Sequence, residues 1–198
     1  MVFDPKTDAQ HPLFVFVGGT GVGKGELMKR LFELFPELRH ATSWTTRARR
    51  DGEAEDAYFF TNPETFEEMI RARRFYEWAE VHGRRYGRTA ESFAPLAEHP
   101  ALCDMTEHGV KTLEEVFGRD ALGMIVIEIV GQNMSPLARR DERAEADGER
   151  AKIDISIHHV IMNDHAPGGL DRAVAEAAAI IQARIRAYHA QKGAVGVS

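Results

Sequence analysis

The hydrophobic positions near the start of the chain predict a buried strand followed by a helix. Residues 13–17 read Leu-Phe-Val-Phe-Val without a polar interruption, which is typical of a strand buried on both faces. A glycine-rich turn comes next, and apolar residues then recur at helical spacing over 26–35 until Pro36 ends the pattern. A strand, a glycine loop and a helix in this order form the first part of a β-α-β unit.

The alternation of strands and helices continues along the chain. Apolar runs predict core strands over 101–105, 122–130 and 157–162, and helical spacing predicts helices over 107–117 and 170–188. Such alternation predicts an α/β fold with a mostly parallel sheet covered by helices on both faces.

Two segments break this alternation. Residues 43–88 are rich in arginine, aromatic residues and short strand-like pieces around a predicted helix over 63–72, which indicates an α+β insert. Residues 132–152 are highly charged and poor in apolar side chains, which favours a solvated, mobile segment.

Composition and charge narrow the classes of function. A chain of 198 residues is long enough for one sizeable core, and a net charge of −6 argues against nucleic-acid or anionic-membrane binding. The polar N-terminus has no signal-like apolar run, and no apolar stretch is long enough for a membrane span, so we expect a soluble cytoplasmic protein. The single cysteine, Cys103, lies in an apolar run and is expected to be a buried small hydrophobe.

The glycine-rich turn has the pattern of a phosphate-binding loop. Residues 18–25 read Gly-Gly-Thr-Gly-Val-Gly-Lys-Gly, which matches G-x-x-x-x-G-K with glycine in place of the final Ser or Thr. Backbone N–H groups of such a loop curl around the β-phosphate, the helix N-terminus faces the anion, and Lys24 would reach the β- and γ-phosphates. A turn that binds nothing is the alternative, but the flanking strand and helix favour phosphate binding. The candidate ATP-binding residues here are Gly18, Gly19, Thr20, Gly21, Val22, Gly23, Lys24, Gly25 and Glu26.

Gly25 cannot supply the hydroxyl that normally ligates Mg²⁺ at this position. The Gly-Lys-Gly run also resembles the loop of adenylate kinases, in which water and nucleotide oxygens hold most of the metal's coordination shell. Asp104, at the end of a predicted strand, could anchor such a water or could be an ordinary strand-end acid. We therefore expect Mg²⁺ to arrive with ATP, and we assign it no direct protein ligand.

A second cluster of polar residues lies in the insert. Residues 43–53 read Ser-Trp-Thr-Thr-Arg-Ala-Arg-Arg-Asp-Gly-Glu, in which closely spaced arginines beside hydroxyl groups could bind an oxyanion. Residues 75–88 then read Phe-Tyr-Glu-Trp-Ala-Glu-Val-His-Gly-Arg-Arg-Tyr-Gly-Arg. Alone, the arginine cluster would more often be a solvated basic turn. With the loop at 18–25, however, these strings in this order resemble the guanylate kinase family, and the resemblance resumes at 160–164 and in the final helix.

The resemblance implies a fold and a reaction. The fold would be a single P-loop NTPase-type domain with its core at about 12–42, 93–131 and 155–190, a nucleoside-monophosphate-binding insert at about 43–92 and a short lid at about 132–154. The reaction would be ATP-dependent phosphorylation of GMP or dGMP to the diphosphate. The substrates would be the partners, with no nucleic acid or membrane involved, and a homodimer is left open.

The resemblance also implies roles for individual residues. Glu77 would read the base, because a carboxylate accepts hydrogen bonds from the N1–H and N2–H₂ edge of guanine, which adenine does not offer. Lys24, Arg47 and the lid residues Arg139 and Arg143 would be catalytic, although a solvated charged face is an equal alternative for the lid arginines. Asn163 would join the ATP site. The acceptor-binding set is Ser43, Arg47, Arg50, Tyr58, Glu77, Tyr86, Arg88 and Asp104.

Arg88 departs from the family pattern, which has a Ser or Thr in contact with the base at this position. Thr89, the next residue, could take over this contact after a small shift. Alternatively, Arg88 could itself donate two hydrogen bonds to O6 and N7 of guanine, or it could indicate a different acceptor. Two other functions therefore stay open. One is a related small-molecule kinase with an acceptor such as a sugar phosphate, and the other is a catalytically weak binding module.

Overall fold

The central feature of the fold is a parallel β-sheet. The computed structural model describes residues 3–118, 121–131, 155–164 and 166–195. Within these ranges five strands pair in parallel in the order β2, β7, β1, β8, β9. The strands are β1 (Leu13–Val17), β2 (Arg39–His40), β7 (Ala101–Asp104), β8 (Ile125–Gly131) and β9 (His159–Asn163). The predicted mostly parallel sheet is confirmed, and its strands end at one common edge.

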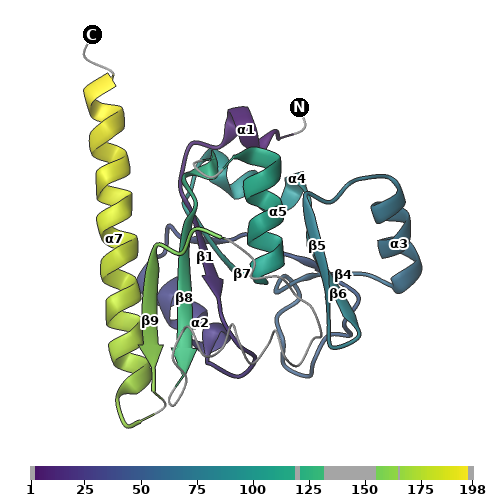
Figure 1. Ribbon diagram of the computed structural model, residues 1–198, viewed down its shortest axis with the longest axis horizontal. Helices are drawn as coiled ribbons and strands as arrows, with labels where there is room; N and C mark the ends of the chain where they lie inside the picture. The colour runs from purple at the N-terminus through teal and green to yellow at the C-terminus, as the bar shows by residue number, and fades with distance from the viewer. Residues whose placement is uncertain (1–2, 119–120, 132–154, 165, 196–198) are drawn as a thin grey trace.

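Helices cover both faces of this sheet (Figure 1). On one face, Phe14 and Phe16 of β1 pack in a cluster with α2 (Lys24–Leu34) and α7 (Gly169–Val195). On the other face, Leu13, Val15 and Val17 pack in a second cluster with α4 (Ala90–Phe93) and α5 (Glu107–Phe117). The alternating residues of one apolar strand thus build two cores, which explains why the run 13–17 contains no polar residue. Short helices complete the framework: α1 (Pro5–Asp8) and the 3₁₀ turns Ala94–Ala97 and Ala121–Gly123.

A second, smaller sheet lies on the side of the molecule away from α7 (Figure 1). Its strands follow the order β4, β3, β6, β5, and the β5–β6 pair is an antiparallel hairpin. Helix α3 packs on this sheet through Phe66, which is fully buried and stacks on Phe75 with ring centroids 4.4 Å apart. The elements are β3 (Trp44–Thr45), β4 (Phe59–Phe60), α3 (Pro63–Arg71), β5 (Glu77–Val81) and β6 (Arg84–Arg88).

Several element boundaries differ from those that the hydrophobic pattern predicts. Strand β8 begins at Ile125 rather than at 122, because Leu122 adopts a left-handed conformation (φ 63°) in a 3₁₀ turn. Strand β9 begins two residues later than predicted, at His159. Strand β2 is too short for its pattern to be recognised in the sequence. The charged segment 132–152 and the predicted lid at about 132–154 lie outside the described residues.

Cys103 is fully buried in β7, as predicted, and burial raises the pKa of its thiol to about 12. It therefore behaves as a small core side chain rather than as a reactive nucleophile. In the part of the chain that the structure describes, no helix combines the length and the apolar character needed to cross a membrane.

Candidate active site

The glycine-rich loop lies at the carboxyl edge of the central sheet, between β1 and α2. Gly23 precedes α2 in a left-handed conformation (φ 91°), and no side chain caps the helix there. The ammonium group of Lys24, the first residue of α2, donates to the carbonyl oxygens of Gly18 and Gly19 at 3.0 Å each. The loop thus combines an uncapped helix N-terminus with a lysine folded over its backbone, which suits an anionic ligand.

Gly18 leaves no room for a side chain. It has a φ of 143°, and an added Cβ would overlap the backbone carbonyl of Ile129 in β8. We expect Gly18→Ala to lower the free energy of unfolding by about 3 kcal/mol, since backbone strain and overlap add. Urea unfolding measures this loss, and Gly21→Ala is the matched control. Gly21 also has a positive φ (80°), but an added Cβ would meet nothing within 4 Å. Equal losses for both variants would contradict the steric argument.

A cavity of about 430 Å³ adjoins the loop, and Gly23, Asn163 and Leu170 are among its lining residues. Asn163 is 2% exposed, and its amide nitrogen donates to the carbonyl oxygen of Val22 at 2.9 Å. Its side-chain oxygen accepts no hydrogen bond within the described residues. A buried acceptor without a partner is unfavourable, so this atom is suited to a ligand donor such as an amino group.

Arg47 and Glu53 form a bidentate ion pair in the insert. The guanidinium donates to the two carboxylate oxygens at 3.0 and 2.6 Å, and its central carbon lies 5.0 Å from the centre of the Tyr58 ring. The hydrogen bond from Arg47 lowers the pKa of Glu53 and keeps it ionised. Glu53 also accepts from the backbone N–H of Arg50 at 3.0 Å. Glu53 therefore orients Arg47, a role that the sequence pattern did not assign.

Tyr58 and Tyr86 lie beside Arg47, with their ring centroids 6.1 Å apart. Burial raises the pKa of Tyr58, so its hydroxyl remains protonated and can donate to an anion. Ser43 is buried just before β3, whereas Arg50 is exposed in the loop after it. The structure thus brings together one arginine and two tyrosines of the predicted acceptor set.

Glu77 and Arg88 form a buried ion pair between neighbouring strands of the small sheet. Their side chains are 4% and 3% exposed, and Arg88 Nη1 donates to Glu77 Oε1 at 2.8 Å. Burial raises the pKa of Glu77, and the Arg88 guanidinium is the largest influence that opposes this rise. Arg88 also donates through Nη2 to the Asp104 carbonyl at 2.6 Å and through Nε to the Ala41 carbonyl at 3.2 Å. Each nitrogen of the guanidinium therefore has a protein acceptor, an arrangement that the sequence did not predict.

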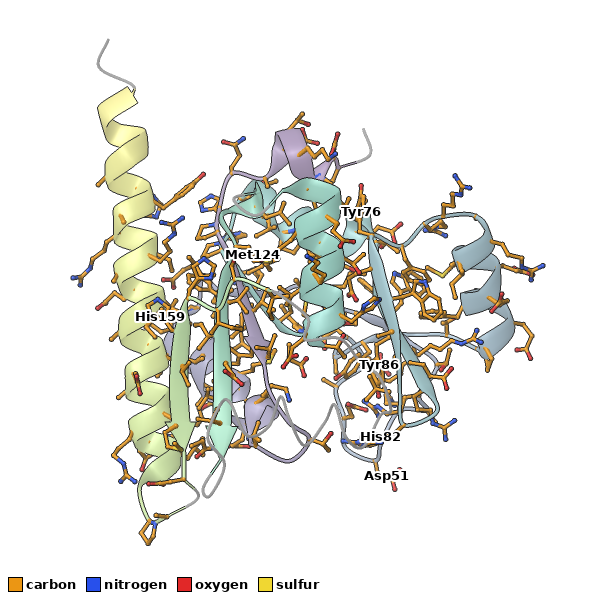
Figure 2. All side chains as sticks on the ribbon, viewed as in Figure 1. Asp51, Tyr76, His82, Tyr86, Met124 and His159 are labelled. Carbon is orange, nitrogen blue, oxygen red and sulfur yellow. The ribbon has the colours of Figure 1, made fainter. Side chains whose placement is uncertain are left out.

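Two contacts bring the small sheet close to the glycine-rich loop. Arg88, on β6 of the small sheet, donates to the carbonyl oxygen of Asp104 on β7. Asp104 is in turn paired with Phe16 of β1, two residues before the loop begins. The hydroxyl of Thr20 lies 3.3 Å from Nε2 of His82. Figure 2 labels His82 at the turn of the β5–β6 hairpin and Tyr86 on β6. The loop and the acceptor cluster therefore share one edge of the molecule.

His40, on β2, lies beside Tyr58 of the acceptor set, and it is not among the site residues predicted from the sequence. Its ring centroid is 6.5 Å from that of Tyr58. Burial, with a smaller effect from Arg88, lowers the pKa of His40 to about 4, so the imidazole is neutral at neutral pH. A lone histidine after Pro36 gives no pattern that could have identified it. Glu53, by contrast, belonged to the recognised string and could have been given a role.

Gly25 and Asp104 are the two positions that bear on a metal ion at this edge. Among the described residues, no group of three or more His, Cys, Asp or Glu side chains is placed to hold a metal ion. Gly25 offers no hydroxyl, and an added Cβ there would meet nothing within 4 Å. Asp104 is the carboxylate that could anchor a metal-bound water at this edge. The predicted lid residues Arg139 and Arg143 lie outside the described residues.

Comparison with known proteins identifies the family. A family model described as "Guanylate kinase" matches residues 10–159. The chain belongs to the guanylate kinase family. The predicted family resemblance is thereby confirmed.

Individual members of the guanylate kinase family are similar over most of the chain. The guanylate kinase of Syntrophotalea carbinolica is 32% identical over 186 residues, which cover 86% of this chain and 85% of that protein. The guanylate kinase of Symbiobacterium thermophilum is 34% identical over 185 residues, which cover 86% of this chain and 84% of that protein. The crystal structure of guanylate kinase from Anaplasma phagocytophilum superposes with a TM-score of 0.59 at 20% identity, covering 88% of this chain and 86% of that one. This last likeness concerns the fold, and it agrees with the predicted P-loop α/β class.

Proposed function

We propose that this chain transfers the γ-phosphoryl group of ATP to GMP and releases ADP and GDP. The observation that carries the proposal is that two candidate sites, one for the donor phosphates and one for the acceptor nucleotide, lie next to each other at the carboxyl edge of the central sheet. The loop at 18–25 with Lys24 suits the donor phosphates, and the cluster around Arg47 and Glu77 suits a nucleoside monophosphate. The family supports the same reaction, since the relatives that match over most of the chain are guanylate kinases.

The donor half of the site would hold ATP by its phosphates. Backbone N–H groups of residues 18–25 surround the β-phosphate, and Lys24 exchanges its two carbonyl partners for phosphate oxygens. The Asn163 side-chain oxygen, which has no hydrogen-bond partner among the described residues, would accept from the base of ATP. Mg²⁺, when bound, neutralises charge on the phosphates, and Asp104 would anchor one of its waters.

The acceptor half would hold the phosphate of GMP for in-line attack. Arg47, already oriented by Glu53, would donate to that phosphate, and Tyr58, Tyr86, Ser43 and Arg50 would complete the shell. A GMP phosphate oxygen then bonds to the γ-phosphorus while the bond from that phosphorus to the β,γ-bridging oxygen breaks, which leaves ADP. No covalent enzyme intermediate is needed, because catalysis consists of positioning and charge neutralisation. We assign Arg139 and Arg143 of the lid to the transferred group.

Base recognition is assigned to Glu77, and Glu77→Gln tests it. A glutamine amide keeps one acceptor oxygen but replaces the other with a donor, which opposes the guanine N–H edge. We expect the ratio of kcat/KM for GMP to that for AMP to fall by about 10- to 100-fold. Steady-state assays with each nucleotide measure it. Glu80→Gln is the control, since Glu80 lies on the same strand but is exposed. An unchanged ratio in Glu77→Gln would remove Glu77 from base recognition.

A panel of acceptors tests the reaction itself. ADP release is measured with ATP, Mg²⁺ and GMP, dGMP, AMP, CMP, UMP, IMP or a ribose bisphosphate. The proposal predicts rapid release with GMP and dGMP and slow release with the others. Turnover of a sugar phosphate alone would favour the related small-molecule kinase, and binding of ATP and GMP without turnover would favour a binding module.

The proposal places the reaction in the cytoplasm, where ATP and GMP are made and used. A homodimer is a further prediction, and sedimentation at micromolar protein concentration tests it.

A further inference from the structure

The position of Arg88 suggests a function different from that of the residue it replaces. The family resemblance places a base-contacting Ser or Thr here, whereas the Arg88 side chain is 3% exposed and reaches Glu77. We propose that Arg88 is a positioning residue: it holds the Glu77 carboxylate ionised and fixed in orientation for the base, and it ties that carboxylate to the central sheet. This inference rests on the proposed function, because it concerns how that site recognises guanine.

The contacts of Arg88 join three elements at one point. One nitrogen holds Oε1 of Glu77 on β5, a second donates to the carbonyl of Asp104 at the end of β7, and the third donates to the carbonyl of Ala41 after β2. Strands β5 and β6 belong to the small sheet, whereas β2 and β7 belong to the central sheet. The guanidinium therefore fixes the carboxylate relative to the sheet edge that carries the donor loop.

The other oxygen of Glu77 is confined from the opposite side by α5. A Cβ added to Gly109, in the first turn of that helix, would lie 2.9 Å from Glu77 Oε2. Glycine is otherwise a poor helix residue, and alanine would ordinarily favour the helix. The absent side chain at Gly109 therefore leaves room for the carboxylate, which is confined between a guanidinium and a helix backbone.

Charge explains why a buried carboxylate needs this partner. The ionisable groups that influence Glu77 are Arg88 on β6, His108 on α5 and Asp104 on β7, while His40 and Cys103 lie near Arg88. Arg88 and His108 favour the ionised carboxylate, and Asp104 opposes it. His108 is exposed, so its effect is weakened by solvent. Without Arg88, burial would favour the protonated acid, and a protonated oxygen would present a hydrogen to the N–H edge of guanine.

Removing Arg88 raises the pKa of Glu77 further, because this guanidinium is the largest influence that opposes burial. The carboxylate of the variant is therefore present at high pH and lost as the pH falls. In Arg88→Gln, the KM for GMP should rise by about tenfold for each pH unit below the raised pKa, with kcat changing less than KM. The wild-type KM should change less with pH than that of Arg88→Gln, because the Arg88 guanidinium opposes protonation of Glu77.

Two further variants separate positioning from general packing. Arg88→Lys keeps the positive charge, so it should restore the pH profile of the wild type with a moderately raised KM for GMP. Arg85→Gln is the matched control, since Arg85 lies on the same strand and pairs with Glu67 at 2.7 Å rather than with Glu77. It should leave the KM for GMP and its pH profile unchanged. A rise in KM that is independent of pH and equal in Arg88→Gln and Arg88→Lys would overturn the proposal.

Infrared spectroscopy without substrate tests the role of Arg88 separately from the proposed phosphorylation of GMP. Infrared spectra of folded Arg88→Gln should show a protonated-carboxyl band that grows as the pH falls. At the same pH the band should be weaker in the wild type, and it should be missing from Arg88→Gln/Glu77→Gln. If Arg88→Gln does not fold, Arg88→Lys carries the test, since lysine keeps the charge but cannot make all three contacts. Absence of GMP turnover in the wild type would refute the proposed function alone, whereas no band in folded Arg88→Gln, or an unchanged KM for GMP in Arg88→Lys, would refute the role of Arg88.

Discussion

Lys24→Ala is expected to lower kcat/KM for phosphoryl transfer by about 10³-fold or more and to leave the fold intact. The ammonium group is the charge that the structure places directly over the glycine-rich loop, where the β- and γ-phosphates would lie. Its partners include two loop carbonyls, which water can satisfy once the side chain is removed. Steady-state rates with ATP and GMP give the loss, and thermal unfolding checks the fold.

Lys29→Ala is the control for this variant, because Lys29 lies on the same helix and is exposed. It should retain the wild-type rate. A folded Lys24→Ala protein with near-normal kcat/KM would show that residues 18–25 are not the donor phosphate site.

Arg47→Ala is expected to cause the second-largest loss, about 10²-fold in kcat/KM for GMP, through a higher KM and a lower kcat. The structure holds this guanidinium in a fixed orientation with Glu53, over the ring of Tyr58, so its remaining donors are already positioned for a phosphate. Glu53→Gln should keep the charge of Arg47 but weaken its alignment, with a loss of about tenfold. Initial rates across GMP concentrations separate the two effects.

The nearby Arg49 supplies a matched control for Arg47. Arg49 is also an arginine of the same loop, but it is exposed and pairs with Glu55 at 3.3 Å. Arg49→Ala should therefore resemble the wild type. Equal losses in Arg47→Ala and Arg49→Ala would indicate that the loop acts only through its total charge, against the assigned role of Arg47.

Local patterns predicted the parts of the fold that depend on neighbouring residues in the chain. The apolar run 13–17 forms β1, and the helix predicted over 107–117 has the observed bounds of α5, with Thr106 as its N-cap. The phosphate-binding pattern of the loop is equally local, since it needs only a strand, glycines and a helix in sequence. Such features require no knowledge of distant contacts.

Features that depend on long-range packing were missed. Strand β2 contains two residues and is defined by its pairing with β7, more than 60 positions later. The left-handed conformation of Leu122 shortens β8 without any glycine or proline at that residue to indicate it. The partners of Arg88 lie 11, 16 and 47 residues away along the chain, so no spacing rule could have paired them.

The central claim is that the γ-phosphoryl group of ATP is transferred to GMP, and following that group tests it most directly. Purified protein is mixed with Mg²⁺, GMP and ATP that carries radioactive phosphorus in the γ position, and the products are separated with time. The proposed function predicts label in GDP, formed in equal amount to ADP, and labelling of GDP that is about 10³-fold slower with Lys24→Ala. Label in inorganic phosphate alone, or no transfer by the folded wild type, would contradict it.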